Sequence, residues 1–296
     1  MNASPSISVF APAKLNLFLA VTGRRADGFH DLVSLVSPID FGDTLRLEPT
    51  GGAADVLECA APGVPTDGNN LVLKAAAAWR AAGGRAPAVR FVLEKRTPHG
   101  AGMGGGSSDA VAALRGLQQL AVRSVDDTTL RAVAAGLGSD CPLFLAGGAS
   151  VMRGRGERLE LLGAEAAGCL SGRRVLVCRP DFGVETPWAY GRLAAGAPAT
   201  YTEAAAAEAR LAEWLAGHRE LESLLANSFE TVVYAKYLAL PALAERLRAD
   251  FGLRLHLTGS GSACFALLGE EADFGAIGRT VRAAWGEGAF VALARL

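Results

Sequence analysis

The residues best suited to chemistry form a glycine-rich stretch, KRTPHGAGMGGGSSD, at positions 95–109. Five of the seven positions from 100 to 106 are glycine, a residue that lets backbone N–H groups turn inward and approach an anion closely. A helix expected to begin at Ser107 would add its unpaired N–H groups and the positive end of its dipole. The stretch therefore predicts a phosphate-binding loop, with a flexible turn as the alternative.

Three other nucleotide-binding templates fit this loop poorly. A Rossmann fingerprint matches Gly100, Gly102 and Gly105, but it should begin where the preceding strand ends, and residues 95–99 intervene. A Walker loop needs a lysine directly before its Ser or Thr, and this loop has none there. The tripeptide D-F-G of protein kinases occurs four times without the other kinase signatures, which indicates turns rather than a catalytic motif.

Two charged residues outside the loop lie in unusual surroundings. Lys14 is a lone cation in an apolar strand segment, costly to bury unless it meets a carboxylate or a substrate anion, although it could also snorkel from a strand edge. Asp140 follows a glycine turn and precedes Pro142 in an apolar stretch, where it could act as a general base or could cap a helix. Both residues are therefore candidates for catalysis that depends on charge, with structural roles as the alternatives.

Composition excludes several classes of protein. The chain has 296 residues, of which 50% are apolar and 20% charged, as is typical of globular proteins. Its 29 basic and 30 acidic residues give a net charge of −1, so no general attraction to nucleic acid or to an anionic membrane is expected. No apolar run reaches the roughly 18–20 residues that span a bilayer. The five cysteines are odd in number and lack C-x-x-C spacing, which predicts reduced thiols, no metal site and a cytoplasmic location.

The strands and helices that must position these residues are partly grouped by type and partly alternate along the chain. This pattern is typical of an α+β fold with mixed sheets in two domains. Strands are expected at 6–11, 14–21, 32–39, 44–49, 88–95, 149–153, 158–162, 173–180, 253–258, 263–268 and 290–296. Helices are expected at 71–83, 107–120, 127–136, 202–216, 226–237, 241–250 and 271–285, with Ser107, Ser108 and Asp109 as capping candidates. Small residues at 163–172 predict a linker, so the domains are expected at 1–164 and 165–296.

The glycine loop resembles the phosphate-binding motif of the GHMP small-molecule kinases, P-x-G-x-G-[LM]-G-S-S, with two extra glycines. The resemblance implies that the loop binds ATP. It extends to the segment NNLV at 69–72 and to the lysine at 95, which the family places near the nucleotide. The implied ATP-binding residues are Asn70, Lys95, Pro98, His99, Gly100, Ala101, Gly102, Met103, Gly104, Gly105, Gly106, Ser107 and Ser108.

Further segments resemble the same family over nearly the whole chain. APAKLN, at 11–16, and GSDCP, at 138–142, resemble the motifs of its catalytic lysine and aspartate, which implies catalytic roles for Lys14 and Asp140. DGFH and TPWAY resemble segments that hold a cytidine base in one branch of the family. The implied substrate-binding residues are Asn16, Phe29, His30, Thr186 and Tyr190.

Two positions depart from the family pattern. Phe29 stands where a tyrosine is usual, which keeps a stacking face but loses a hydroxyl group. Asp109 replaces a common asparagine and brings a carboxylate into the first turn of the expected helix, where it could compete with phosphate unless it points away.

The resemblance implies a GHMP-kinase-like fold: an N-terminal ATP-binding domain like domain 2 of ribosomal protein S5 and a ferredoxin-like C-terminal domain. It implies ATP-dependent phosphorylation of the 2-hydroxyl of 4-(cytidine 5′-diphospho)-2-C-methyl-D-erythritol, in non-mevalonate isoprenoid precursor biosynthesis, with Mg2+ delivered by ATP. A GHMP kinase of the homoserine or mevalonate type and a non-catalytic nucleotide-binding regulator are the alternatives. The expected partners are these small molecules, not nucleic acid or a membrane, and the expected state is a monomer or a weak homodimer.

Overall fold

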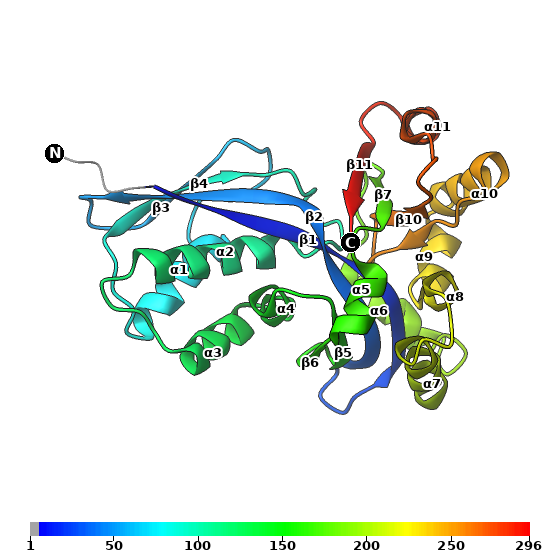
Figure 1. The fold of residues 1–296 in the computed structure, drawn as a ribbon, viewed down its shortest axis with the longest axis horizontal. Coiled ribbons are helices and arrows are strands. Elements are labelled where there is room, and N and C mark those ends of the chain that lie inside the picture. The colour runs from blue at the N-terminus through cyan, green and yellow to red at the C-terminus, as the bar shows by residue number, and fades with distance from the viewer. Residues whose placement is uncertain (1–5) are drawn as a thin grey trace. The chain divides into compact units, whose positions relative to one another are not determined.

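The computed structural model describes residues 6–296 as a mixture of strands and helices (Figure 1), as the sequence predicts. The strands are β1 Ile7–Arg24, β2 His30–Thr50, β3 Val56–Cys59, β4 Ala88–Glu94, β5 Ser150–Gly154, β6 Arg158–Leu161, β7 Arg174–Arg179, β8 Ala226–Asn227, β9 His256–Leu257, β10 Cys264–Leu268 and β11 Phe290–Arg295. The helices are α1 Leu71–Ala81, α2 Gly105–Leu120, α3 Asp127–Leu137, α4 Cys141–Ala146, α5 Ala164–Leu170, α6 Thr186–Ala195, α7 Ala204–Leu215, α8 Leu221–Leu224, α9 Glu230–Lys236, α10 Ala239–Phe251 and α11 Phe274–Trp285. No helix of the described residues is both long enough and apolar enough to cross a membrane.

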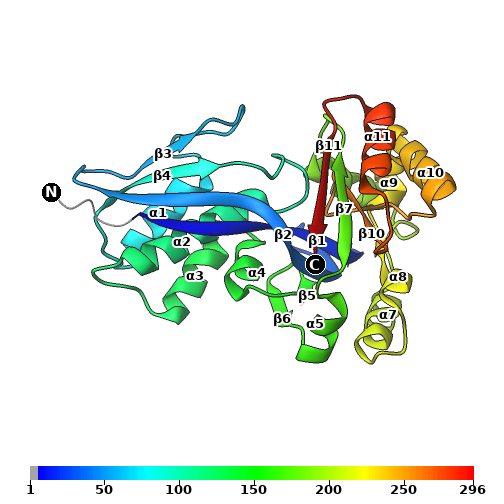
Figure 2. The same ribbon diagram turned by 45° about the horizontal axis from the view of Figure 1, so that its top comes forward.

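The strands form one mixed sheet and one antiparallel sheet. The mixed sheet has seven strands, with the order β3-β4-β2-β1-β8 and with β5 and β6 branching from β2. In it β3 runs parallel to β4 and β8 parallel to β1, whereas β4 and β5 run antiparallel to β2. The other sheet has the order β11-β7-β10-β9 and is antiparallel throughout (Figure 2). A mixed sheet beside an antiparallel one is the α+β architecture that the sequence predicts.

The prediction of four short strands in the first quarter is wrong, because the structure has two long strands, β1 and β2. Gly42, which suggested a break, lies inside β2. A Cβ atom on Gly42 would lie 2.2 Å from the carbonyl oxygen of Ala11, so glycine here permits a close backbone approach rather than a turn.

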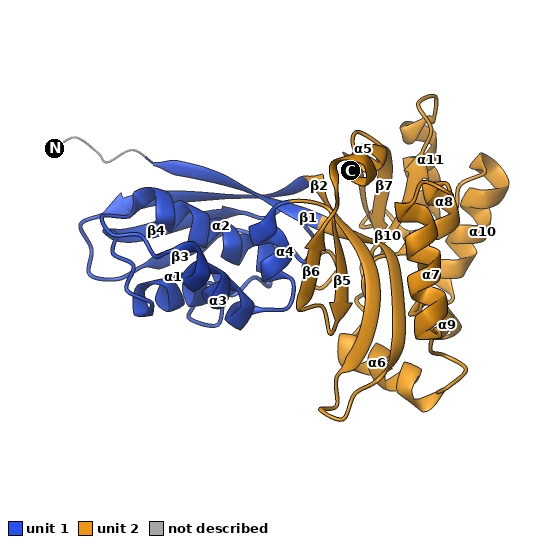
Figure 3. Cartoon of the chain, turned by 60° about the horizontal axis from the view of Figure 1, so that its bottom comes forward, with its two compact units in different colours: residues 1–13, 41–99, 104–147 blue, residues 14–40, 100–103, 148–296 orange. Residues whose placement is uncertain are grey.

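The chain divides into two compact units, each assembled from separate stretches (Figure 3). Unit 1 comprises residues 1–13, 41–99 and 104–147, and unit 2 comprises residues 14–40, 100–103 and 148–296. The long strands β1 and β2 contribute to both units, as does the glycine loop. The expected domain boundary near residue 164 stays a prediction.

Each unit has its own apolar core. In unit 1, strands β2, β3 and β4 pack against helices α1 to α4 through buried side chains that include Leu47, Trp79, Phe91, Leu114 and Phe144. In unit 2, strands of the antiparallel sheet pack against helices that include α6, α9, α10 and α11, through Leu176, Phe229, Leu247, Leu257 and Val281. Burial of these large side chains stabilises each unit by the hydrophobic effect.

Three local predictions are corrected by the structure. The linker expected at 163–172 is wrong: it contains helix α5, because alanine and glutamate favour helix and Gly163 provides an N-cap. Helices α4 and α6 were not expected, although each has a proline in its first turn, a typical helix start. The strand expected at 253–258 is reduced to β9, two residues long.

Candidate active site

The glycine loop ends in a left-handed residue that starts helix α2. Gly100, Gly102 and Gly104 have φ angles of 67°, 78° and 70°, a region that favours glycine. Helix α2 begins at Gly105, and no side chain caps it. The prediction that Ser107, Ser108 and Asp109 cap this helix is wrong, because Gly104 turns the chain before them. The N-terminus of α2 therefore presents backbone N–H groups suited to an anion.

Asp140 lies beside the start of this helix. A Cβ atom on Gly104 would lie 3.2 Å from Asp140 Oδ2 and 2.9 Å from the ring of Phe144. Asp140 occupies the N-cap position of α4, yet its carboxylate does not cap that helix, which disfavours the capping alternative. The Cys141 thiol, 3.7 Å from the carbonyl oxygen of Ser107, joins the first turns of α2 and α4. A carboxylate and an uncapped helix N-terminus thus lie together within unit 1.

Lys95 lies in a buried cluster of charges beneath the loop. Its Nζ is 2.5 Å from Asp43 Oδ2 and 2.7 Å from Asp109 Oδ2, and its side chain is 8% exposed. Burial lowers the pKa of Lys95, but the two carboxylates outweigh this effect and raise it. Burial also raises the pKa of Asp109, and the Lys95 ammonium only partly opposes that shift. The Asp109 carboxylate therefore points toward Lys95. This ion pair explains how an acidic residue can be accommodated beside a phosphate-binding loop.

Asp43 is the more deeply embedded of the two carboxylates. It is fully buried, and its Oδ1 accepts hydrogen bonds from the backbone N–H groups of Arg96 and Thr97 at 2.6 and 2.7 Å. The carboxylate thus fixes the chain just before the glycine loop while it neutralises Lys95.

We expect Asp43→Asn to lower the free energy of unfolding by about 3 kcal/mol, because removing one partner of a buried ion pair leaves a charge poorly compensated. The measurement is urea unfolding of the purified protein. Asp109→Asn is the matched control: it leaves the Lys95–Asp43 pair intact and should cost roughly 1 kcal/mol. Equal losses in the two variants would show that Asp43 is not the main anchor of Lys95.

Two hydroxyl groups near the loop have no hydrogen-bond partner among residues 6–296. Ser108 Oγ and Thr97 Oγ1 belong to residues that are each 1% exposed, and within that described range neither atom is hydrogen-bonded. A buried, unsatisfied hydroxyl oxygen is a suitable ligand for a hard cation such as Mg2+ or for a phosphate oxygen. No group of three or more His, Cys, Asp or Glu residues in the described part of the chain could hold a metal ion. Ser108 Oγ and Thr97 Oγ1 are therefore the hydroxyl groups beside the loop that could contact such an ion or a phosphate oxygen.

Asn70 starts helix α1. Its Oδ1 accepts a hydrogen bond from the backbone N–H of Val72 at 2.8 Å, and its Nδ2 donates to the carbonyl oxygen of Pro65 at 2.7 Å. The side chain is therefore a helix cap. Its expected contact with the nucleotide stays a prediction, as does that of His99, which is exposed.

Lys14 and Asn16 form a buried polar pair on strand β1 in unit 2. Lys14 is 5% exposed, and its Nζ donates to Asn16 Oδ1 at 2.6 Å. Asn16 Nδ2 donates to Ser34 Oγ at 2.9 Å, and the backbone N–H of Gly259 donates to Asn16 Oδ1 at 3.1 Å. The same strand is buried on both faces over most of its length, so Lys14 does not snorkel from an exposed edge. Asn16 therefore holds the lysine head in a fixed position.

A second glycine turn, TGSGS at residues 258–262, packs directly on the first part of the glycine loop. A Cβ atom on Gly102 would lie 2.5 Å from the carbonyl oxygen of Thr258, so only glycine permits this approach. The backbone N–H of Ala263 donates to the carbonyl oxygen of Ala101 at 3.2 Å, and that of Lys14 donates to Met103 at 3.0 Å. Unit 2 thus brings together Lys14, the loop residues 100–103 and the TGSGS turn.

His30 is buried among aromatic rings. Its ring stacks on Tyr190 with centroids 4.7 Å apart, and its Nε2 lies 3.1 Å from the hydroxyl of Tyr201. Burial, and secondarily the charge of Arg24, lowers the pKa of His30, so the imidazole is neutral near pH 7. A neutral imidazole has one donor and one acceptor nitrogen and can form hydrogen bonds with the edge of a base.

The remaining substrate candidates are distributed over unit 2. Phe29 is 54% exposed, with the guanidinium of Arg155 over its ring at 4.8 Å. Thr186 Oγ1 lies 2.8 Å from Ser260 Oγ of the glycine turn. The ring of Tyr190 is thus placed against His30, and that of Phe29 against Arg155.

Sequence reasoning missed two residues and one long-range contact that support the candidate site. Asp43 was not singled out, although an acid within the alternating apolar pattern of a strand was a usable signal. Tyr201 lies in the alanine-rich region 195–225, where no motif marks it. The Thr258 hydroxyl accepts a hydrogen bond from the backbone N–H of Asn16 at 2.9 Å, a contact across 242 positions that no local pattern reveals.

Comparisons with known proteins show which family this chain belongs to. The family model of the GHMP kinases N terminal domain matches residues 70–148. The 4-diphosphocytidyl-2-C-methyl-D-erythritol kinase of Synechococcus sp. (strain CC9902) is 39% identical over 274 residues, which cover 90% of this chain and 88% of that protein. The protein of the same name from Methylacidiphilum infernorum (isolate V4) is 36% identical over 274 residues, which cover 92% and 89%.

Solved structures extend the comparison to the fold. A crystal structure of a 4-(cytidine 5′-diphospho)-2C-methyl-D-erythritol kinase matches with a TM-score of 0.78 and 35% identity, covering 98% of this chain and all of that one. A homoserine kinase from Cytophaga hutchinsonii matches with a TM-score of 0.72 at 18% identity, covering 100% of this chain and 96% of that one. The latter likeness concerns the fold alone. Together these matches confirm the fold class predicted from the sequence.

Proposed function

Because this chain belongs to the 4-diphosphocytidyl-2-C-methyl-D-erythritol kinases, a branch of the GHMP kinases, we propose that it phosphorylates the 2-hydroxyl of 4-(cytidine 5′-diphospho)-2-C-methyl-D-erythritol with ATP. The observation that carries the chemistry is the Asp140 carboxylate beside the uncapped start of helix α2. Homoserine and mevalonate are less favoured substrates, since the solved kinases of those names are only 18% and 13% identical to this chain.

The triphosphate of ATP is proposed to bind the glycine loop at the N-terminus of α2. Backbone N–H groups there, together with the helix dipole, stabilise anionic oxygens. Ser108 Oγ, buried and without a partner, supports a further contact with a phosphate oxygen or with Mg2+. Mg2+ bound with ATP neutralises charge on the phosphates during transfer.

Asp140 is proposed to accept the proton of the substrate hydroxyl as its oxygen attacks the γ-phosphorus. Lys14 is proposed to lower the pKa of that hydroxyl and to stabilise the negative charge of the transition state. The hydrogen bond from Lys14 to Asn16 supports this role, because it holds the ammonium in a fixed position. These steps need no covalent intermediate.

The cytosine base is proposed to contact Phe29, His30 and Tyr190, with Thr186 and Asn16 as further polar contacts. The exposed ring of Phe29 supports stacking, and the neutral imidazole of His30 supports hydrogen bonding to the base edge. Tyr190 stacks on His30 and has the ring of Phe229 edge-on at 4.8 Å, so its ring is held in place beside the imidazole.

A coupled assay of ADP release tests the substrate directly. The purified protein is given ATP and, in separate reactions, the cytidyl substrate, homoserine or mevalonate. We expect turnover with the cytidyl substrate and only background rates with the other two alcohols. Faster turnover of either alternative would replace the proposed substrate.

We expect Gly106→Asp to weaken ATP binding about tenfold or more without destabilising the fold. Gly106 is exposed in the first turn of α2, and a Cβ atom there would meet only Leu71, at 3.6 Å. The added carboxylate suits the helix dipole but repels a triphosphate. Gly104 is unsuitable for this test, because a side chain there would clash with Phe144.

The control for this experiment is Gly106→Asn, which has nearly the same shape without the charge. Calorimetric titration with a non-hydrolysable ATP analogue should give near wild-type affinity for the asparagine variant. If the aspartate variant also binds normally, the triphosphate does not lie at this helix terminus.

We also propose that the protein works in the cytoplasm as a monomer or a weak homodimer. All five cysteines are free thiols, which supports a reducing compartment. Light scattering of the purified protein over a range of concentrations tests the oligomeric state.

A further inference from the structure

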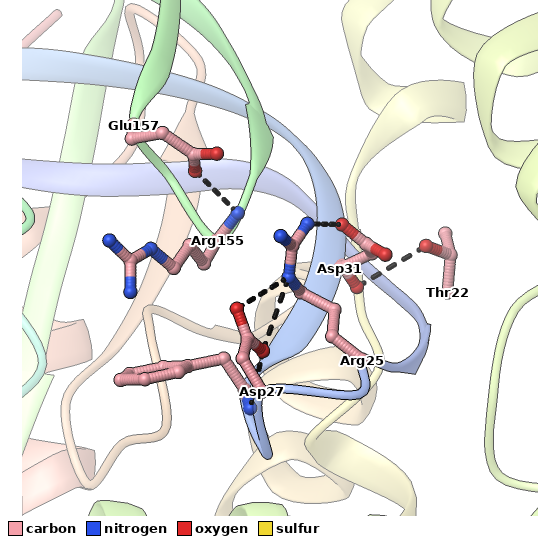
Figure 4. Close-up of polar contacts among 7 residues, drawn as sticks. Thr22, Arg25, Asp27, Asp31, Arg155 and Glu157 are labelled. Atoms are coloured by element: carbon pink, nitrogen blue, oxygen red, sulfur yellow. Dashed lines mark hydrogen bonds and ion pairs between the residues drawn. The ribbon is translucent and has the colours of Figure 1, made fainter.

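The turn between β1 and β2 holds Phe29 at the surface. Arg25 pairs with Asp27 at 3.2 Å and with Asp31 at 2.9 Å, so one guanidinium joins both ends of the turn (Figure 4). The backbone N–H of Phe29 donates to Asp27 Oδ1 at 3.1 Å, and the backbone N–H of Arg25 donates to the carbonyl oxygen of Phe29 at 2.8 Å. Gly28, with φ of 85°, completes the turn. A large apolar ring is thus fixed with more than half of its surface in solvent.

The turn between β5 and β6 brings a cation onto this ring. Arg155 is exposed, and its guanidinium carbon lies 4.8 Å from the centroid of the Phe29 ring. The neighbouring acid, Glu157, accepts a hydrogen bond from the backbone N–H of Arg155 at 2.7 Å, which is visible in Figure 4. In the described part of the chain the Arg155 guanidinium itself makes no hydrogen bond or ion pair. The guanidinium therefore lies over one face of the Phe29 ring, and its N–H donors stay next to that ring in unit 2.

These two groups match the two ends of a nucleoside diphosphate. An exposed aromatic ring stacks on a base, whereas a guanidinium binds phosphate oxygens through parallel hydrogen bonds. The carboxylates of Asp27 and Asp31 pair with Arg25, and Arg155, whose charge also helps to lower the pKa of Asp27, keeps its N–H groups for an incoming anion. A contact with ring and guanidinium together would discriminate a phosphorylated nucleoside from a bare one.

We propose that Arg155 is a specificity-determining residue, which binds the diphosphate of the substrate whose base stacks on Phe29. This inference rests on the proposed function and adds to it a residue outside the motifs that identify the family. It also explains why the exposed Phe29 ring lies next to the turn between β5 and β6.

The test compares binding of cytidine and cytidine diphosphate by calorimetry, with the ATP site filled by a non-hydrolysable ATP analogue. The wild-type protein should bind the diphosphate more tightly than the nucleoside. Arg155→Gln should weaken diphosphate binding about tenfold and leave cytidine binding within about twofold, because only the charged contact is lost. Arg155→Lys should recover part of the loss. Phe29→Ala should weaken both ligands by similar factors.

Arg158→Gln is the matched control, since Arg158 is an exposed arginine of the same hairpin. It should leave both affinities unchanged. An unchanged diphosphate affinity in Arg155→Gln, or an equal loss for cytidine, would overturn the inference, the latter because Arg155 would then only hold the ring. Failure of the wild-type protein to release ADP with the cytidyl substrate would instead overturn the proposed function, so the two failures are distinguishable.

Discussion

Asp140→Asn is expected to lower kcat with the cytidyl substrate by about 10²- to 10⁴-fold, the usual cost of removing a general base. Asparagine keeps the volume of the side chain but cannot accept the proton of the attacking hydroxyl. The carboxylate does not cap helix α4, so the substitution should leave that helix intact. The affinity for ATP should change little or increase slightly, because a negative charge near the loop is removed. Steady-state kinetics with both substrates, together with a thermal unfolding curve, measures these effects.

Asp126→Asn is a matched control for this prediction. Asp126 also occupies a helix N-cap in unit 1, but its side chain does cap its helix, accepting from the backbone N–H of Thr129 at 2.7 Å. Asparagine is an equally good N-cap, so this variant should keep both stability and turnover. If Asp140→Asn retained near wild-type kcat, the base would have to be sought in another residue or in solvent.

The parts of the site that could be predicted from the sequence are those determined by residues close together in the chain. The dense run of glycines predicts a tight loop, and the structure has positive φ at Gly100, Gly102 and Gly104. A lysine in an apolar segment signals a buried cation, and Lys14 is buried. By contrast, Lys95 and Asp43 are 52 positions apart, and only the pairing of β2 with β4 brings them together.

The fold shows the same division between local and distant causes. Helix α1 was predicted within two residues, because its capping residue and its alanine-rich sequence act locally. The continuity of β1 and β2 does not follow from the sequence, because Pro12 and Gly42 are residue types that commonly end strands. Whether such residues end a strand depends on the neighbouring strands that cover it, and this is tertiary information. His30 likewise depends on Tyr201, a partner 171 positions away.

Lys14→Met is expected to lower kcat by about 10²- to 10³-fold while changing the affinity for ATP much less. The ammonium is proposed to act on charge that develops in the transition state, and a preorganised donor in a water-poor site contributes most there. Methionine keeps the apolar stem within β1, and Asn16 Oδ1 keeps its hydrogen bond from the backbone N–H of Gly259. The local structure should therefore survive the substitution, as a thermal unfolding curve would report.

Lys74→Met is the control for this prediction, because Lys74 is an exposed lysine of helix α1 and its loss should leave kcat unchanged. Comparing the change in kcat with the change in KM for ATP in Lys14→Met identifies the role of the lysine. A fall in kcat at nearly constant KM for ATP means that the charge acts on the transition state. A variant whose main defect is a raised KM for ATP would assign Lys14 to ground-state binding of the triphosphate, and Asp140 would then have to activate the hydroxyl without it.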